Sequence, residues 1–203
     1  MFQLIPIDRS LLWKLVLVHI LIIALSNYLV TIPLVLFGFK LTWSAFIFPL
    51  TMLVTDLTIR LKNKDHATAM VGFAFIPAII ASIAVIVLSG TPFDVAWRIG
   101  LSSGVAYLCG NFVGICVFDK VWRNWKYWIW APAISSVLAN IVDTFTFFAV
   151  AFYQSTDEYM AANWHLIAAS QTELKILVSA LIIVPIYGLI LSWITDKSVK
   201  NMT

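Results

Sequence analysis

The sequence predicts an all-α, polytopic membrane protein, a single domain of 203 residues that crosses the bilayer six times. Hydrophobic residues make up 62% of the chain and charged residues 11%, with a mean hydropathy of +0.95. Soluble domains contain roughly 45–50% apolar and about 25% charged residues, so this chain has too few charges for a water-soluble surface. Six apolar runs reach the roughly 20 residues that a helix needs to span the hydrocarbon core. No stretch between them is long enough for a soluble catalytic domain.

The expected spans, each with a few residues of slack, lie near 11–32, 41–59, 69–89, 95–117, 128–152 and 173–194. The first run has a basic flank but is too long for a signal-peptide core and lacks an Ala-x-Ala exit, so we expect it to remain as a span. Cys109 and Cys116 share the fourth run, where their α-carbons would lie about 10.5 Å apart along one helix. That separation is beyond disulfide reach, so we expect both cysteines to be packing residues.

The connection between the fifth and sixth spans, Tyr153–Thr172, contains no Lys or Arg. It opens on a capping-box pattern, with Ser155 as N-cap and Glu158 three residues later. Apolar and aromatic residues then recur at helical spacing, which predicts an amphipathic helix near 156–169 in the outer membrane interface. A lid over a site and a plain connector both fit this helix.

The placement of basic residues predicts the orientation in the membrane. Ten of them flank the spans on the side of the two termini: Arg9, Lys14, Arg60, Lys62, Lys64, Lys120, Arg123, Lys126, Lys197 and Lys200. Only Lys40 flanks the spans on the other side. Because Lys and Arg concentrate in cytoplasmic loops, we expect both termini in the cytoplasm. Arg98 and Lys175 lie just inside their spans and are expected to snorkel to the outer interface.

A faint internal repeat links the two halves of the chain. Two Trp-to-Asp pairs share a separation of 13 residues: Trp43 with Asp56, and Trp130 with Asp143. The segment 26–30 in the first span also resembles 110–114 in the fourth. Three spans per half would make the halves inverted in the membrane, an arrangement in which transporters bind substrate between the repeats. Coincidence between short motifs in so apolar a chain is the alternative.

Asp143 is the strongest candidate for a functional side chain inside the spans. A charge at the bilayer centre costs about 2.5–3.5 kcal/mol even on a lenient scale, so it needs a compensating role. Ser136, Asn140 and Asp143 fall on one helical face, and Thr144 lies one turn after Asn140. We expect this polar stripe to face the bundle interior, either to bind a substrate or to hydrogen-bond other helices.

For the other polar residues in the spans, a structural role explains the sequence at least as well as a role in substrate binding. Asp56 lies near the cytoplasmic end of the second span, one turn before Arg60, and an ion pair between them would also suit a helix end at the membrane surface. Asn27 and Asn111 are uncharged, so helix packing is their simpler role. His19 in the first span fits a satisfied buried histidine better than a proton relay.

One enzyme motif is present. The segment Gly100–Gly104 reads G-L-S-S-G and matches the G-x-S-x-G nucleophile pattern, which works on a strand-to-helix turn. Here it lies in an apolar span, where two glycines four apart suit close helix packing. A serine nucleophile, Ser102 or Ser103, with His19 or His165 as base is the enzyme alternative. No H-E-x-x-H, phosphate-binding glycine loop or zinc spacing occurs, so we expect no enzyme, metal or cofactor.

Seven short motifs are not diagnostic one by one, but their order and spacing along the chain are specific as a set. They occupy residues 26–30, 42–46, 48–49, 55–60, 140–144, 175–177 and 185–188. With them the chain resembles the queuosine precursor transporter family, also described as vitamin-uptake-transporter-like, from about Leu11 to Ile194. Family members often have a glycine directly after the motif that ends at Arg60, where this chain continues Leu61-Lys62.

The resemblance implies a bacterial inner-membrane importer of 7-cyano-7-deazaguanine, with the aminomethyl relative as a second candidate cargo, for making queuosine in tRNA. Such a cargo is flat, with adjacent N–H donors that a carboxylate can accept, while an Asn supplies both donor and acceptor. The expected binding residues are Asn27, Asp56, Asn111, Asn140 and Asp143, with Trp43, Trp130, Phe46 and Phe147 for stacking and Arg60 and Lys175 as charge partners. The expected partners are this small molecule and the lipid bilayer, without direct nucleic-acid contact, and a homo-oligomer stays open.

Two other functions remain as alternatives. Small six-helix vitamin-binding proteins act as the substrate-binding subunit of an ATP-driven importer, although no coupling-partner motif stands out here. The less favoured alternative is the intramembrane serine enzyme described above.

Overall fold

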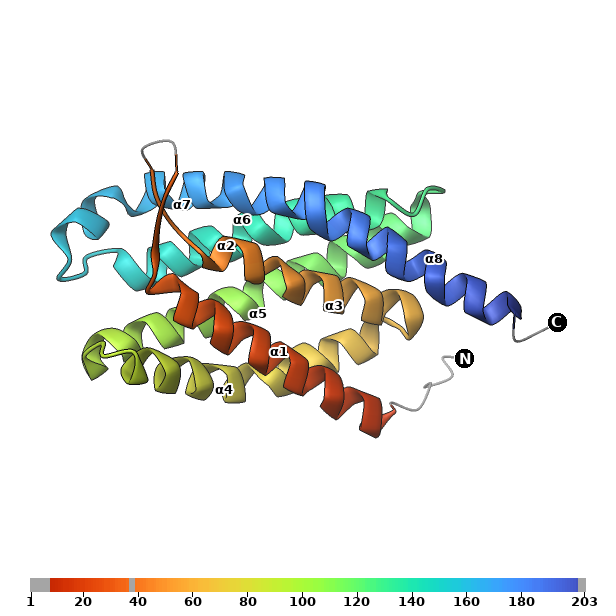
Figure 1. Cartoon of the computed structure of the whole chain (residues 1–203), viewed down its shortest axis with the longest axis horizontal. Helices are drawn as coiled ribbons and strands as arrows, with labels where there is room; N and C mark the ends of the chain where they lie inside the picture. The colour runs from red at the N-terminus through yellow and green to blue at the C-terminus, as the bar shows by residue number, and fades with distance from the viewer. Residues whose placement is uncertain (1–7, 37–38, 201–203) are drawn as a thin grey trace.

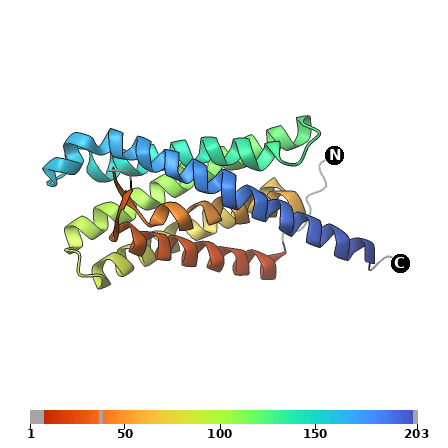
Figure 2. The ribbon, with the colours of Figure 1, turned by 45° about the horizontal axis from the view of Figure 1, so that its top comes forward.

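The computed structural model describes residues 8–36 and 39–200 as a bundle of long helices with one short hairpin. Its elements are α1 (Arg9–Val30), β1 (Pro33–Leu36), β2 (Phe39–Thr42), α2 (Ser44–Ile47), α3 (Pro49–Leu61), α4 (Lys64–Leu88), α5 (Phe93–Asn124), α6 (Trp130–Phe152), α7 (Glu158–Val178), the π-helical turn η1 (Ser179–Ile183) and α8 (Val184–Lys200). Among the described residues, six helical segments are long and apolar enough to cross a membrane, which confirms the predicted fold class. Figures 1 and 2 show these segments running lengthwise side by side.

The two ends of the bundle are distinct. α1 begins and α8 ends at the same end, together with the α3–α4 and α5–α6 connections (Figure 1). We name this the terminal end. The β1–β2 hairpin and the α4–α5 and α6–α7 connections lie at the other, the hairpin end. An even number of crossings places both termini at the same end. The cytoplasmic location of the terminal end stays a prediction, which rests on the Lys and Arg count. The inverted repeat also stays a prediction, which rests on the spacing of the short motifs.

The second span is divided at Pro49. Phe48 ends α2 and begins α3 with helical backbone angles, and Pro49 occupies the start of α3. Proline has no N–H to donate to the preceding turn, but it suits the first turn of a helix. The two helices therefore follow one another as a single span, Ser44–Leu61.

The hairpin was not expected from the sequence. Its antiparallel register pairs Pro33 with Thr42 and Leu36 with Phe39. The residue before a proline disfavours helical angles, so Pro33 explains why α1 ends at Val30. The ladder then satisfies backbone groups in a connection that would otherwise leave them unpaired.

The chain between the fifth and sixth spans also differs from expectation. The predicted interfacial helix near 156–169 is not a separate element, because α7 starts at Glu158 and continues into the sixth span as one helical segment up to Ile194. Its N-cap is Asp157, whose carboxylate accepts a hydrogen bond from Met160 N at 3.0 Å, so the assignment of Ser155 as N-cap was wrong. Neither Gly nor Pro interrupts residues 158–184, and η1 ends two residues before Pro185, whose ring removes a helical donor.

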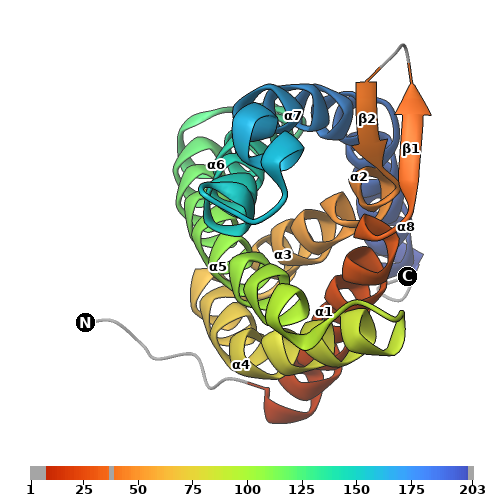
Figure 3. The ribbon, with the colours of Figure 1, turned by 90° about the vertical axis from the view of Figure 1, so that its left-hand side faces the viewer.

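The second span forms the centre of the bundle. More than half of Ser44–Leu61 is buried, against about a third of α1 and α4. Figure 3, which looks along the bundle, shows α3 enclosed by the longer helices. Side chains on this span and those that face it from the surrounding helices are therefore shielded from lipid.

Candidate functional site

A pocket opens at the hairpin end of the bundle. Its volume is about 570 Å³ when the open mouth is included. Its walls come from α1, β2, α2, the α2–α3 junction, α5, α6 and α7. The lining residues are Ser26, Asn27, Val30, Thr42, Ser44, Phe48, Ser103, Ala106, Asp143, Phe147, Phe148, Phe152, Met160, Gln171 and Lys175.

Asp143 and Lys175 form an ion pair in this pocket. Lys175 Nζ lies 2.7 Å from Asp143 Oδ2, and the two side chains are only 7% and 3% exposed. The ammonium also lies 4.5 Å from the centroid of the Phe48 ring. Opposite charges buried together offset part of each other's desolvation. The expectation that Lys175 snorkels to the outer interface is therefore wrong, because its ammonium points inward to Asp143.

Close packing of α5 on α6 positions Asp143. A Cβ on Gly110 would lie 2.7 Å from Asp143 Cβ and 3.2 Å from the Ala139 carbonyl oxygen. Since real side chains do not approach so closely, the two helices can meet here only at a glycine. The glycines of the G-x-S-x-G segment have the packing role expected of them, because Cβ atoms on Gly100 and Gly104 would collide with Ile83 and Ile79 of α4.

Asn27 lines the pocket from α1. Its amide nitrogen donates to Ser82 Oγ at 2.7 Å and to Ser103 Oγ at 2.9 Å, which ties α1 to α4 and α5. No group in the described part of the chain donates to its amide oxygen. This oxygen is therefore available as an acceptor for a ligand N–H.

Gln171 closes one side of the pocket against the hairpin. Its Oε1 accepts a hydrogen bond from Thr42 N at 3.2 Å, and its Nε2 donates to Thr42 Oγ1 at 2.8 Å. Ser44 Oγ lies 2.6 Å from Thr42 Oγ1. The sequence analysis missed these three residues, although Gln171 lies one turn before Lys175 and a polar stripe on the sixth span could have indicated it.

The aromatic wall is made of phenylalanines. Phe48, Phe147, Phe148 and Phe152 line the pocket, and the rings of Phe147 and Phe148 meet edge to face at 5.3 Å. Of the four aromatic residues expected to stack on a cargo, only Phe147 lies there.

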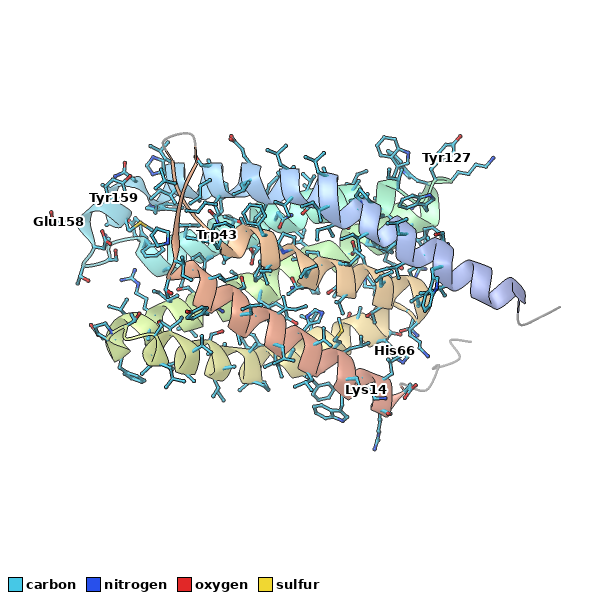
Figure 4. All side chains as sticks on the ribbon, in the orientation of Figure 1. Lys14, Trp43, His66, Tyr127, Glu158 and Tyr159 are labelled. Carbon is cyan, nitrogen blue, oxygen red and sulfur yellow. The ribbon has the colours of Figure 1, made fainter. Side chains whose placement is uncertain are left out.

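The other three expected stacking residues lie outside the pocket. Trp43 packs on Phe46 at 5.7 Å and is 44% exposed at the hairpin end (Figure 4). Trp130 packs on Trp125 beside the α5–α6 connection at the terminal end.

Two expected binding amides hold helices together outside the pocket. Asn140 donates to Ser179 Oγ at 3.0 Å, and its buried amide oxygen has no hydrogen-bond partner in the described structure. Asn111 accepts from Thr55 Oγ1 at 2.9 Å and donates to the Tyr107 carbonyl oxygen. Both amides lie on the helix faces that meet inside the bundle.

Asp56 is buried nearer the terminal end and does not line the pocket. Its Oδ2 accepts a hydrogen bond from Ser135 Oγ of α6 at 3.1 Å. The expected ion pair with Arg60 does not form. The Arg60 guanidinium instead lies 3.3 Å above the centroid of the Trp122 ring, where a cation is attracted to the aromatic face.

The serine-enzyme alternative finds no geometric support in the described residues. Ser102 donates to the Arg98 carbonyl oxygen, and Ser103 accepts from Asn27. His19 Nδ1 lies 2.8 Å from the Tyr107 hydroxyl, so it does not activate either serine. Across residues 8–36 and 39–200, no cluster of three or more His, Cys, Asp or Glu side chains could hold a metal ion.

Two curated bacterial proteins are similar to this chain over almost its whole length. A "Queuosine precursor transporter" of Escherichia coli (strain K12) is 34% identical, over 95% of this chain and 93% of that protein. A "Probable queuosine precursor transporter" of Haemophilus influenzae (strain ATCC 51907 / DSM 11121 / KW20 / Rd) is also 34% identical, over 93% of this chain and 89% of that protein. No solved structure matches the fold.

A family described as "Putative vitamin uptake transporter" matches residues 42–190, a segment that contains α2 through the start of α8 and most of the pocket-lining residues. The match covers more than half of the chain, and the two relatives extend it to the α1 side of the pocket. The chain therefore belongs to the vitamin uptake transporter family and is a queuosine precursor transporter relative with six membrane-spanning helices.

Proposed function

We propose that this protein imports 7-cyano-7-deazaguanine, with the aminomethyl relative as a second cargo, across a bacterial inner membrane for queuosine synthesis in tRNA. The observation that carries the proposal is the Asp143–Lys175 pair inside a pocket with an aromatic wall. The names of the two similar proteins support the same class of cargo.

The polar groups of the pocket suit the edge of a deazaguanine. Its ring N–H and exocyclic amino group point in the same direction, and a carboxylate such as Asp143 accepts both side by side. Lys175, once turned from Asp143, can donate to the carbonyl oxygen of the same ring. Asn27 Oδ1 offers a further acceptor. The cargo would thus replace the contact that the two charged side chains make with each other.

The apolar walls suit the faces of the same cargo. Phe48, Phe147 and Phe148 line the pocket that contains the ion pair, and the Phe48 ring centroid lies 4.5 Å from Lys175 Nζ. Stacking of an aromatic side chain on a base contributes about 1–3 kcal/mol in proteins that bind nucleobases. A flat heterocycle would therefore gain binding free energy from stacking on its faces and from hydrogen bonds at its edge. A flexible polar solute could not stack and would bind more weakly.

The direction of transport follows from the predicted orientation. If both termini lie in the cytoplasm, the hairpin end and the pocket mouth face the outside. A pocket open to the outside is the arrangement in which an importer collects its cargo.

Purified protein in liposomes tests the proposal. We expect labelled 7-cyano-7-deazaguanine to exchange into the vesicles without any other protein, and the unlabelled compound to raise the thermal stability of the protein in detergent. Absence of both binding and exchange would contradict the proposal. Binding without exchange would favour the alternative of a substrate-binding subunit that needs an ATP-driven partner.

A further inference from the structure

The two carboxylates buried in the spans differ in their charge environment. Asp143 has the Lys175 ammonium at 2.7 Å. Asp56 is 4% exposed, and the hydrogen bond that it accepts comes from the neutral hydroxyl of Ser135. An ionised carboxylate in a low-dielectric interior requires a nearby positive charge, and a protonated one does not.

The cation nearest to Asp56 along its own helix is engaged elsewhere. Arg60 lies over the Trp122 ring instead of facing the carboxylate one turn before it. The buried hydroxyl of Tyr187 on α8 has no hydrogen-bond partner in the described structure, so it does not donate to Asp56. The hydrogen bond that Asp56 accepts thus comes from the neutral Ser135 hydroxyl, whereas a structural ion pair would need a fixed cation.

Among the side chains that the structure describes, the two salt bridges join Arg123 with Asp119 and Lys175 with Asp143, so neither places a cation on Asp56. His19 of α1 is engaged with Tyr107 of α5, and the Lys64 ammonium of α4 points to Cys116 of α5. His66 of α4 contacts the Asn63 side chain near the terminal surface. On α6 the charged residue is Asp143, which is already paired with Lys175.

Ser135, which donates to Asp56, lies on α6, the helix that also carries Asp143 of the pocket. Ser135, the partner of Asp56, lies eight residues before Asp143, which is about 12 Å along the helix at 1.5 Å per residue. Between and beside them the buried Asn140 Oδ1 and Thr144 Oγ1 have no hydrogen-bond partner in the described structure. Each of these two atoms can take up a new hydrogen bond when a side chain rotates or a water molecule enters.

We propose that Asp56 is a proton-binding site that couples import to the transmembrane proton gradient. The inference rests on the proposed import function and extends it to the driving force. One proton from the outer water forms an O–H bond on the Asp56 carboxylate, and the neutral acid persists while the terminal end is closed. When that end opens with the cargo, the O–H bond breaks and the proton passes to inner water. Each neutral cargo thus enters with one proton and one positive charge.

Proteoliposomes separate exchange of cargo from its net accumulation. Counterflow of labelled 7-cyano-7-deazaguanine needs no net proton movement, whereas accumulation above equilibrium under an acid-outside gradient does. We expect Asp56→Asn to retain counterflow within about twofold of the wild type and to lose accumulation entirely. Asp94→Asn, which changes an exposed carboxylate in the first turn of α5, is the matched control and should accumulate as the wild type does. An Asp56→Asn protein that still accumulates cargo in response to the gradient would overturn the proposal.

An infrared measurement tests the proton site without any cargo. We expect the wild type and Asp94→Asn at neutral pH to show the carbonyl stretch of a protonated carboxylic acid, and Asp56→Asn to lack it. The same band in all three proteins would overturn the proton site. A band that depends on Asp56 in a protein without counterflow would leave the proton site standing and remove the proposed cargo.

Discussion

At the scale of single residues, Asp143 and Lys175 have to be considered together, because each offsets the desolvation of the other at 2.7 Å. Removing one member of a buried pair strands the other charge, whereas replacing both with neutral groups is often tolerated. This asymmetry separates a structural role of the pair from a role in binding. A single substitution cannot do so, because instability alone would reduce binding.

Asp143→Asn is expected to lower both stability and cargo binding, because the Lys175 ammonium stays buried without its partner. Breaking a buried pair on one side typically costs about 3–5 kcal/mol. Thermal unfolding in detergent and binding of 7-cyano-7-deazaguanine measure the two effects. Adding Lys175→Met removes the stranded charge, so the double variant should regain most of the stability and still fail to bind. Wild-type affinity in the double variant would assign the pair a purely structural role.

The same residues predict a preference among purine-like compounds. If Asp143 accepts an N–H pair, guanine-type deazapurines should stabilise the protein and adenine-type ones should not, because an adenine edge turns a ring acceptor toward the carboxylate. An unsatisfied buried polar group costs about 1–3 kcal/mol, which corresponds to roughly tenfold weaker binding or more. A thermal-shift series measures this difference, and equal shifts with adenine and 7-cyano-7-deazaguanine would contradict it.

At the scale of elements, the contact of α5 with α6 determines where the Asp143 carboxylate lies. Gly110→Ala would insert a methyl group 2.7 Å from Asp143 Cβ, against atoms close to the backbone that cannot turn away. Overpacking of this kind costs typically about 1–3 kcal/mol and separates the helices. We therefore expect lower thermal stability and weaker binding of 7-cyano-7-deazaguanine.

Gly72→Ala is the matched control for this contact. Gly72 lies in the middle of α4, and a Cβ there would meet no atom within 4 Å. Replacement of a helical glycine by alanine in open space stabilises by roughly 0.5–1 kcal/mol, and binding should not change. Equal effects of the two substitutions would show that the α5–α6 separation does not control the pocket.

The elements also show how far the sequence is informative. The spans were predictable because hydropathy is summed over about 20 residues, so local errors cancel. Two local features were not predictable. The hairpin that starts at Pro33 depends on backbone pairing between two short apolar strands. The continuation of α7 from Glu158 depends on where an amphipathic helix begins and whether it joins the next span.

The candidate site was predictable only in part. Asp143 was identified because a charge inside a span is rare and costly, whereas Asn27 and Phe147 were expected in the site only from the family resemblance and the flat cargo that it implies. For Lys175 the family resemblance implied a charge partner, whereas its position in the sequence suggested snorkelling, because a lysine near a span end snorkels or pairs depending on the rotation of its helix. That rotation is set by packing against other helices, which a hydropathy pattern does not contain.

At the scale of the whole molecule, the two ends of the bundle are closed to different degrees. The hairpin end contains the pocket, whereas aromatic rings pack together toward the terminal end. Trp128 stacks on Tyr187 at 5.9 Å, and Phe118 meets Tyr187 edge to face at 6.3 Å. Gly188 admits the Trp128 ring against α8. A transporter with a pocket open at one end and packed side chains at the other must rearrange the packed end to release its cargo.

The orientation of these ends in the membrane is the last property to test, because import through this pocket requires the hairpin end to lie outside. Single cysteines at Lys62 and Lys126, both exposed at the terminal end, should be shielded from an impermeant thiol reagent in intact cells. A cysteine at Gln154, exposed in the α6–α7 connection, should react. The experiment needs a background without the two free cysteines, Cys109 and Cys116. Labelling in the reverse pattern would place the pocket mouth in the cytoplasm, and the open state of this structure would then release cargo to the inside instead of collecting it from the outside.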